Sequence, residues 1–252
     1  MSMALLSLDG KRVSCRGIVF DKDGTLMDSL KIWPRLIRTR AGILEKKLNL
    51  TTEITRLTER VMGLEENDRI ALRSVIVIGT REQTAAAVNA LLYLHLGLPW
   101  DSGLAAILAA FDEADLEVDL ASQAIPMFGT LEMLSALHKA GVKIAVATND
   151  SLLRTRSLLE AAKMSPFISA CACRDEVREG KPAPALFRLA CERLELEPQE
   201  CLAVGDSLLD IEMGRAGRAA LTVGVLTGAS IFGELDGRAD VILKSVSEIR
   251  PA

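Results

Sequence analysis

Apolar residues along the chain fall into two kinds of segment that alternate. Short runs, several of them apolar at consecutive positions, are typical of strands covered on both faces in a parallel sheet. Longer segments between them repeat apolar residues at spacings of three and four, which predicts amphipathic helices. The expected strands are 16–21, 142–149, 167–172, 200–206, 221–226 and 239–244, and helices are expected at 130–140, 152–163, 183–194 and 209–216. The alternation predicts an α/β fold, a doubly wound parallel sheet with right-handed crossovers.

One long stretch of the chain has hardly a strand-like run. Between about residues 30 and 121 the pattern is amphipathic throughout, with breaks at Gly63, Gly79 and 97–103. Helices are expected there at 31–48, 51–62, 67–78, 81–96 and 103–116. The sequence therefore predicts an α/β core domain of residues 1–29 and 122–252 with an inserted all-helical cap domain of residues 30–121.

Composition and charge restrict the class of partner. Of the 252 residues, 49% are apolar, which is ample for a core. The net charge is −4 and the charges are evenly spread, so no basic face is indicated for nucleic acid or anionic lipid. The longest apolar stretches, such as 104–111, fall well short of the roughly 20 residues that cross a bilayer. We expect a small-molecule partner, with no nucleic acid and no membrane.

The amino terminus and the glycine positions argue against a secreted protein and against common nucleotide-binding sites. The first residues have neither a basic segment nor a long apolar one, so they do not resemble a signal peptide, and we expect a cytoplasmic protein. Neither the G-x-G-x-x-G pattern nor the phosphate-loop lysine pattern occurs, which disfavours a dinucleotide or P-loop site. The sequence indicates no oligomeric state.

Polar residues end four of the expected strands or follow them closely. Ligands of open α/β sheets bind outside the carboxyl ends of the strands, so these positions are the first candidates for a site. Each of these four polar segments, taken alone, could be a turn or a helix cap. Asp21 and Asp23 are harder to explain in this way, because two carboxylates at the mouth of a buried strand repel unless a cation compensates. The four segments are DKDGT (21–25), TND (148–150), Lys181-Pro182 and GDSLLD (205–210).

Taken together, these segments resemble the haloacid dehalogenase superfamily of phosphohydrolases. The resemblance is to members with a helical cap inserted after the first motif, and among them to the phosphoglycolate phosphatase-like group. It implies a Rossmann-like core and hydrolysis of a small phosphate monoester through an aspartyl phosphate. The matching segments are FDKDGTLMDS (20–29), IPMFGTLEMLSALHKAGVKIAVATND (125–150), DEVREGKPAPALF (175–187) and CLAVGDSLLDIEMGRAGRA (201–219).

The resemblance gives the two aspartates of the first motif distinct roles. Asp21 is expected to attack phosphorus, and Asp23 to protonate the leaving oxygen and later deprotonate water. The Thr148 hydroxyl and the amide of Asn149 are expected to bind phosphoryl oxygens. Lys181 is expected to supply a fixed positive charge to the nucleophile and the phosphate.

The carboxylates also predict a metal ion. Four aspartates and a phosphate dianion near one lysine require a hard divalent cation, for which Mg²⁺ is the default. By resemblance its ligands are the carboxylate of Asp21, the backbone carbonyl of Asp23 and the carboxylate of Asp206. Asp210 is expected to lie beside these ligands without binding the ion itself.

Two basic residues complete the expectations. Side chains alternate along an extended segment, so Lys22 is expected to point away from Asp21 and Asp23 as a solvated or loop-packing lysine. In the cap, Arg81 follows a glycine between two helices and is the first candidate for reading a substrate carboxylate. Phosphoglycolate is the leading candidate among small phosphate esters.

Two alternatives to a phosphatase stay open. A phosphomutase acting on a sugar phosphate would use the same residues and return the phosphoryl group to a substrate hydroxyl. A non-catalytic module could use the acidic crevice only to hold a metal or a phosphorylated ligand, although such a module would not need Asp23.

Overall fold

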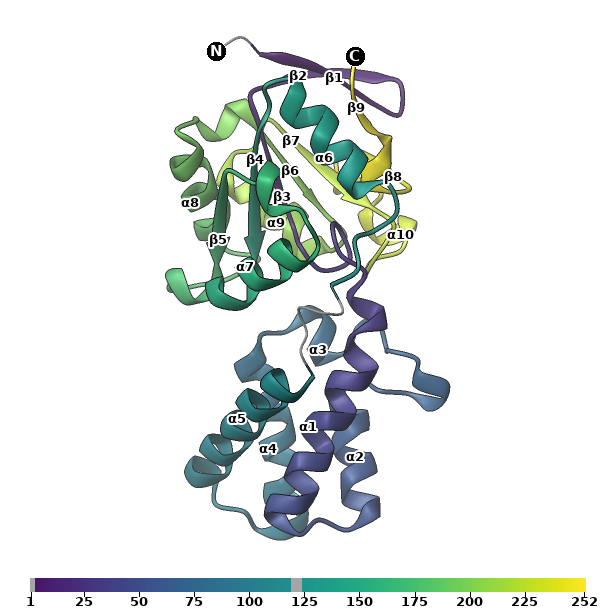
Figure 1. Ribbon diagram of the computed structural model, residues 1–252, viewed down its shortest axis with the longest axis vertical. Helices are drawn as coiled ribbons and strands as arrows, with labels where there is room; N and C mark the ends of the chain where they lie inside the picture. Colours follow the sequence, from purple (N-terminus) through teal and green to yellow (C-terminus); the bar gives the residue numbers. More distant parts are fainter. Residues whose placement is uncertain (1–2, 119–123) are drawn as a thin grey trace. The chain divides into compact units, whose positions relative to one another are not determined.

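The computed structural model describes residues 3–118 and 124–252, and the chain divides into two compact units. The first, called the core here, comprises Met1–Ser29 and Ala124–Ala252. The second, called the helical unit, comprises Leu30–Gln123. Figure 1 draws the elements of both, and each unit is described by itself.

The core is built on a six-stranded sheet of order β5-β4-β3-β6-β7-β8 in which every neighbouring pair is parallel. Helices α6 and α7 lie on one face, and α8 and α9 pack together on the other (Figure 1). This confirms the predicted doubly wound α/β fold. The strands are β3 (Gly17–Phe20), β4 (Lys143–Thr148), β5 (Ala170–Cys173), β6 (Cys201–Gly205), β7 (Leu221–Val225) and β8 (Val241–Leu243). The helices are α6 (Thr130–Lys139), α7 (Leu152–Ala161), α8 (Ala185–Leu194), α9 (Leu208–Gly217) and α10 (Phe232–Leu235).

The central strands are hydrophobic for the reason inferred from the sequence. All residues of β3 and β6 are buried, because helices cover both faces of the sheet. On the α8 side, Phe187 and Leu186 pack against small side chains such as Ala145 and Ala203 of the strands. Small residues on the strands let the helices approach closely, which fixes the ends of β3, β4 and β6 relative to one another.

A second, antiparallel sheet was not predicted. Strands β1 (Ala4–Leu8) and β2 (Lys11–Cys15) form a hairpin, and β9 (Ile249–Pro251) pairs with the other edge of β1. Asp9 and Gly10 connect the hairpin with φ angles of 49° and 84°. An Asp-Gly pair between two short strands is a known hairpin signal, so the sequence contained the information.

The helical unit contains five α-helices within residues 30–118. Thr51 and Thr80 cap α2 and α4 by accepting hydrogen bonds from backbone N–H groups, and Gly63 and Gly97 end these helices with positive φ. The unit's interior includes Phe111, whose side chain is fully buried. The helices are α1 (Trp33–Leu48), α2 (Thr52–Met62), α3 (Val75–Ile78), α4 (Arg81–Leu96) and α5 (Trp100–Glu117).

The helix predicted over 67–78 is wrong for most of its length. Only a short 3-10 turn (Glu66–Asp68) and the one-turn helix α3 form there. Asn67 and Asp68 have φ angles of 58° and 62°, in the left-handed region that interrupts a right-handed helix. Asparagine and aspartate tolerate this region better than other residues with side chains, and their adjacency was the overlooked signal.

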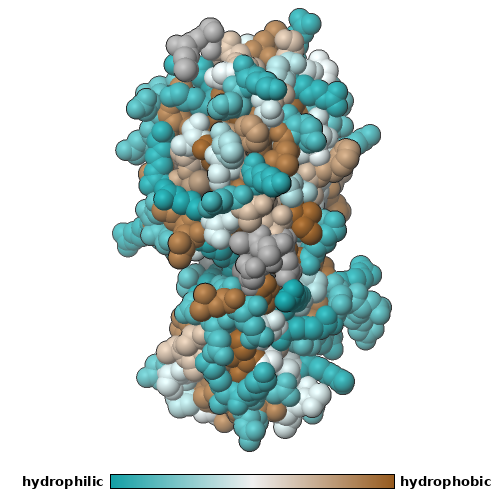
Figure 2. Space-filling model, in the orientation of Figure 1, coloured by the Kyte–Doolittle hydropathy of each residue, from teal (hydrophilic) through white to brown (hydrophobic). Residues whose placement is uncertain are grey.

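No helix in the described ranges has the length and apolar character needed to cross a bilayer. On the face drawn in Figure 2, hydrophilic residues cover most of each unit, and hydrophobic residues form small separate groups. Buried apolar residues such as Phe20, Phe111 and Phe187 form the interiors of the two units.

Candidate active site

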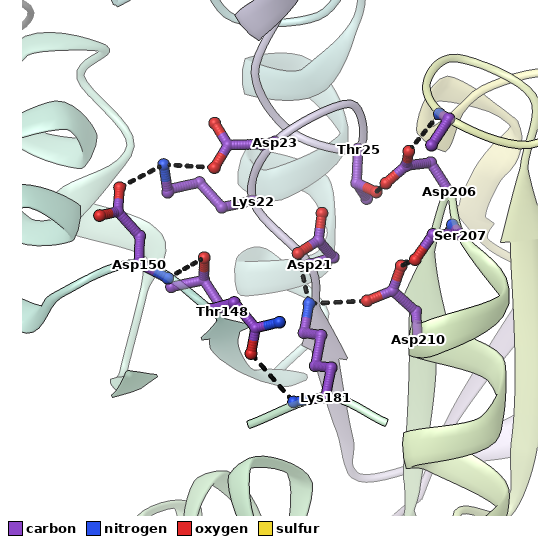
Figure 3. A network of polar contacts seen from close by, with 12 residues as sticks. Asp21, Lys22, Asp23, Thr25, Thr148, Asp150, Lys181, Asp206, Ser207 and Asp210 are labelled. Atoms are coloured by element: carbon purple, nitrogen blue, oxygen red, sulfur yellow. Dashed lines mark hydrogen bonds and ion pairs between the residues drawn. The ribbon is translucent and has the colours of Figure 1, made fainter. Parts of the chain in front are cut away.

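The site lies at the carboxyl ends of the central strands of the core. Asp21 directly follows β3, and its backbone N–H donates to the carbonyl of Val204 in β6 at 2.8 Å, so the chain is held in register up to the aspartate. The side chain of Asp21 is buried, and the amine of Lys181 donates to its Oδ1 (Figure 3). These two residues are 160 positions apart in the sequence.

Two more carboxylates meet Asp21 from the end of β6. Asp206 follows the strand, and Asp210 lies in the first turn of α9. One carboxylate oxygen from each of Asp21, Asp206 and Asp210 lies within 4.8 Å of the others. Asp210 accepts from Lys181 Nζ at 2.6 Å through Oδ1, and from the backbone N–H and hydroxyl of Ser207 through Oδ2. Lys181 therefore bridges two members of this acidic cluster.

In the acidic cluster, the pKa values of Asp21 and Asp206 are raised. Burial raises the pKa of Asp21 to about 6; Lys181 opposes this, and the carboxylates of Asp210 and Asp23 add to it. Burial, followed by the charges of Asp21 and Asp210, raises the pKa of Asp206 well above its usual range. Burial alone would lower the pKa of Lys181, but the two carboxylates it touches more than offset this and raise it. The three carboxylates thus carry more negative charge than one ammonium neutralises.

The loop after β7 and the turn after β3 together hold Asp206 in place. Asp206 Oδ2 accepts from the backbone N–H of Ala229 at 2.6 Å, and Oδ1 accepts from the hydroxyl of Thr25 at 3.2 Å. Both bonds need a close backbone approach. A Cβ at Gly228 would lie 2.0 Å from Asp206 Oδ2, and one at Gly24, whose φ is +81°, would lie 2.7 Å from it. Glycine is therefore required at these two positions by space, and at Gly24 also by conformation.

Thr148 and Asn149 lie at the end of β4. Thr148 is buried, and its hydroxyl oxygen accepts from the N–H of Asp150 at 3.2 Å. Asn149 Oδ1 accepts from the backbone N–H of Lys181 at 2.9 Å, which fixes the loop carrying the lysine. A Cβ at Gly180 would lie 2.4 Å from this oxygen. The structure therefore connects the TND segment to the Lys181 loop.

The position of Lys22 corrects the sequence expectation. Lys22 is neither solvated nor turned away from both aspartates: it is 1% exposed, and its amine lies 2.6 Å from Asp23 Oδ2 and 3.1 Å from Asp150 Oδ2. The expectation failed because β3 ends at Phe20, so the alternation of side chains within a strand does not extend to residues 21–23.

The Asp23 carboxylate accordingly has other partners than the carboxylates of the acidic cluster. Its Oδ2 pairs with Lys22, and its Oδ1 accepts from the hydroxyl of Ser29. In Figure 3 the Asp23 side chain points toward Lys22, whereas that of Asp21 points toward Lys181. Neighbouring aspartates of one motif thus face two different lysines.

The amino-acid sequence that builds this site matches a known protein family. Residues 15–218 match the model of the haloacid dehalogenase-like hydrolases. The chain belongs to this family. The predicted family and its hydrolase class are thereby confirmed.

Relatives within the family are phosphatases by name. The chain is 29% identical over 205 residues to an N-acetylmuramic acid 6-phosphate phosphatase of Pseudomonas aeruginosa, covering 81% of this chain and 79% of that protein. It is 28% identical over 241 residues to a phosphoglycolate phosphatase of Escherichia coli, covering 94% and 92%. The crystal structure of a predicted phosphoglycolate phosphatase from Haemophilus somnus has the same fold, with a TM-score of 0.69, 23% identity and coverage of 93% and 96%.

The acidic cluster of this hydrolase is suited to a divalent cation. Its three carboxylates are buried and supply oxygen ligands, which hard cations prefer. Each carboxylate oxygen has two acceptor positions, so the hydrogen bonds to Asp206 leave room for a metal bond. The raised pKa values of Asp21 and Asp206 indicate that added positive charge would stabilise their ionised forms.

Arg81 lies in the helical unit, at the start of α4. Its guanidinium donates to Asp112 Oδ1 at 2.8 Å and lies 3.7 Å from Asp115 Oδ2. It also lies over the ring of Phe111, 5.8 Å from the centroid. Carboxylates of α5 therefore already partner this arginine, and its part in substrate choice stays a prediction.

Proposed function

We propose that the protein is a Mg²⁺-dependent phosphomonoesterase that forms an aspartyl phosphate on Asp21. The observation that carries the proposal is the buried Asp21 carboxylate, which touches the amine of Lys181 and lies beside Asp206. Membership of the hydrolase family and the phosphatase names of its relatives support the same class.

The chemistry divides between two aspartates. An oxygen of Asp21 attacks phosphorus, the bond from phosphorus to the ester oxygen breaks, and Asp23 gives its proton to that oxygen. Asp23 then takes a proton from water as the water attacks the phosphorus of the aspartyl phosphate, which releases inorganic phosphate and restores Asp21. Over the two steps Asp23 gives up one proton and regains one, so the turnover ends with Asp23 protonated as it began.

The other residues at the strand ends hold and neutralise the phosphoryl group. The amine of Lys181 stabilises the negative charge shared by the nucleophile and the phosphoryl oxygens. The Thr148 hydroxyl and the amide of Asn149 donate to the same oxygens. Asp210 keeps Lys181 in place through the 2.6 Å ion pair.

Asp21, Asp206 and the backbone carbonyl of Asp23 would hold Mg²⁺, which supplies further positive charge to the phosphoryl oxygens. Following the resemblance, Asp210 would lie beside the ion without binding it; its Oδ1 accepts from Lys181, and its Oδ2 accepts two hydrogen bonds from Ser207. The excess of carboxylates over cations in the acidic cluster supports this assignment.

For the substrate we propose a small phosphate ester that carries a carboxylate, with phosphoglycolate first. Both glycolate and N-acetylmuramic acid, which occur in the names of the relatives, are carboxylic acids. Arg81 is the cap residue proposed to read this group.

The direct test is phosphate release from a panel of phosphorylated metabolites, with and without Mg²⁺. Asp21→Asn should abolish release. Asp9→Asn, a change of an exposed aspartate in the β1–β2 turn where asparagine also tolerates positive φ, is the matched control and should keep full activity. Full activity of Asp21→Asn would refute the covalent mechanism. Interconversion of sugar phosphates without phosphate release would identify the phosphomutase instead.

A further inference from the structure

Lys22 occupies an unusual position for a lysine beside a candidate active site. Its side chain is 1% exposed, and its amine contacts the carboxylates of Asp23 and Asp150. Its backbone carbonyl accepts from the N–H groups of Leu26 and Met27, both at 3.0 Å, so the residue also anchors the turn that follows β3. A buried ammonium is retained only where its partners are fixed.

The partners of Lys22 join two strand ends. Asp23 belongs to the turn after β3, and Asp150 lies two residues beyond the end of β4. Asp150 is itself fixed: its Oδ1 accepts from the N–H of Ser151 at 2.9 Å, and its Oδ2 lies 3.2 Å from Arg154 Nε. Asp150 is therefore a rigid support through which Lys22 can hold Asp23.

The charges favour this arrangement. Burial alone would lower the pKa of Lys22, but Asp23 and Asp150 more than offset it and raise the pKa. Burial would raise the pKa of Asp150, but Lys22 and Arg154 outweigh this and hold it below its usual range. The ammonium of Lys22 thus lies between two carboxylates, one of which also contacts Arg154.

We propose that Lys22 is a positioning residue for proton transfer: it fixes Oδ2 of Asp23 and leaves Oδ1 as the oxygen that exchanges the proton. An ammonium has only donors, so a proton on Oδ2 would face Lys22 without an acceptor. Oδ1 instead meets the hydroxyl of Ser29, which can both donate and accept. This inference rests on the proposed function, in which Asp23 protonates the leaving oxygen.

Leaving groups of different acidity provide the first test. An alkoxide needs a proton as it leaves, whereas 4-nitrophenolate does not, so a displaced general acid slows only the first. With enzyme in excess over substrate, Lys22→Met should slow release of the alcohol from an alkyl phosphate by about 10- to 100-fold. Release of 4-nitrophenolate should change by less than about threefold, with little change in KM. Equal losses for both substrates, or no loss, would overturn the proposal.

A double-mutant cycle provides the second test. If Lys22 acts through Asp23, then Lys22→Met in the Asp23→Asn background should cost no more than about a further twofold. If the rate loss of the double variant equals the product of the two single losses, Lys22 acts separately from Asp23, and the proposal is overturned. Lys143→Met, which removes a half-buried lysine at the other end of β4, is the control and should show no dependence on the leaving group.

A milder variant keeps the test decisive if Lys22→Met does not fold, as judged by circular dichroism. Asp150→Asn retains the Lys22 contact with Asp23 but removes its support, and should slow alkyl substrates about 3- to 10-fold more than 4-nitrophenyl phosphate. An equal effect on both would count against positioning. Wild-type protein that hydrolyses neither substrate would instead refute the proposed function itself, which separates the two failures.

Discussion

Two clusters of aspartates at the same edge of the sheet have pKa values that shift in opposite directions, although burial raises the pKa in both. In the acidic cluster, Asp21, Asp206 and Asp210 share Lys181, and the pKa values of Asp21 and Asp206 are raised. In the second group, Asp23 and Asp150 share Lys22, with Arg154 beside Asp150, and the pKa of Asp150 is lowered.

The difference is one of charge balance. The acidic cluster has three carboxylates for one ammonium, whereas the second group has two carboxylates for two cations. The first group is therefore poised to take up further positive charge, as a metal site and a nucleophile require. The second is complete without a ligand, which suits a support for proton transfer.

The largest effect expected from this comparison comes from removing either lysine. Lys181→Met removes charge that every substrate uses, so kcat should fall by about 10³-fold for alkyl and aryl phosphates alike. Lys22→Met should discriminate between them, as described above. The difference is measured by plotting log kcat of each variant against the pKa of the leaving alcohol or phenol. Plots of equal slope for the two variants would contradict the distinction between the acidic cluster and the Lys22 group.

Stability without metal should change in opposite directions when each group loses an aspartate. The raised pKa of Asp21 means that its ionisation costs the folded state stability as pH rises from about 4 through about 6. The lowered pKa of Asp150 means that its ionisation contributes stability above its ordinary pKa, and this is lost as pH falls through the folded value.

At pH 8 in EDTA, Asp21→Asn should therefore stabilise the protein, and Asp150→Asn should destabilise it. The effects should each be about 1–3 kcal/mol in the free energy of unfolding by urea. The Asp21 difference should shrink toward pH 4, whereas the Asp150 difference should shrink only below the ordinary aspartate pKa, as pH falls through the lowered pKa of the folded state. The same sign for both variants would contradict the assigned charge balance.

The loop after β7 offers a steric test of the acidic cluster. Gly228→Ala should destabilise the protein by about 1–3 kcal/mol, because the new Cβ meets Asp206 at 2.0 Å. It should also weaken Mg²⁺ binding by displacing the carboxylate. The matched control is Gly233→Ala, where a Cβ has no neighbour within 4 Å, and it should leave both properties unchanged. Calorimetric Mg²⁺ titration and thermal unfolding measure the two effects.

The smallest expected effect is a pH-dependent stabilisation by Mg²⁺. A metal binds the ionised carboxylates, so at pH 5, below the raised pKa of Asp21, protons compete with it. At pH 7.5, above the pKa of Asp21, protons no longer compete at this carboxylate. Added Mg²⁺ should therefore raise Tm by a few degrees more at pH 7.5 than at pH 5. An equal shift at both pH values would place the metal elsewhere.

Much of the site was predictable because of one geometric rule. The carboxyl ends of parallel strands meet at one edge, so Asp21, Asp206 and the end of β4 had to lie near one another once the strands were recognised. Lys181 follows no strand directly, and its role beside the nucleophile came from the family resemblance. The apolar runs were long enough to locate every strand of the main sheet.

The failures have local and long-range causes. Lys22 was misplaced because alternation holds only inside a strand, and β3 ends at Phe20. The β1–β2 hairpin had its Asp-Gly signal but was short and only partly apolar. The contact of Gly228 with Asp206 has no local signal, since it depends on how the loop after β7 folds back over β6.

The central claim, that Asp21 carries the phosphoryl group, has a direct chemical test. Protein mixed with substrate and Mg²⁺ is quenched and treated with borohydride, which reduces an acyl phosphate to an alcohol, and its peptides are then analysed by mass spectrometry. The account predicts that the aspartate at position 21 is converted to homoserine, and that this requires both substrate and Mg²⁺. Rapid phosphate release with position 21 unmodified, or with another carboxylate reduced, would contradict it.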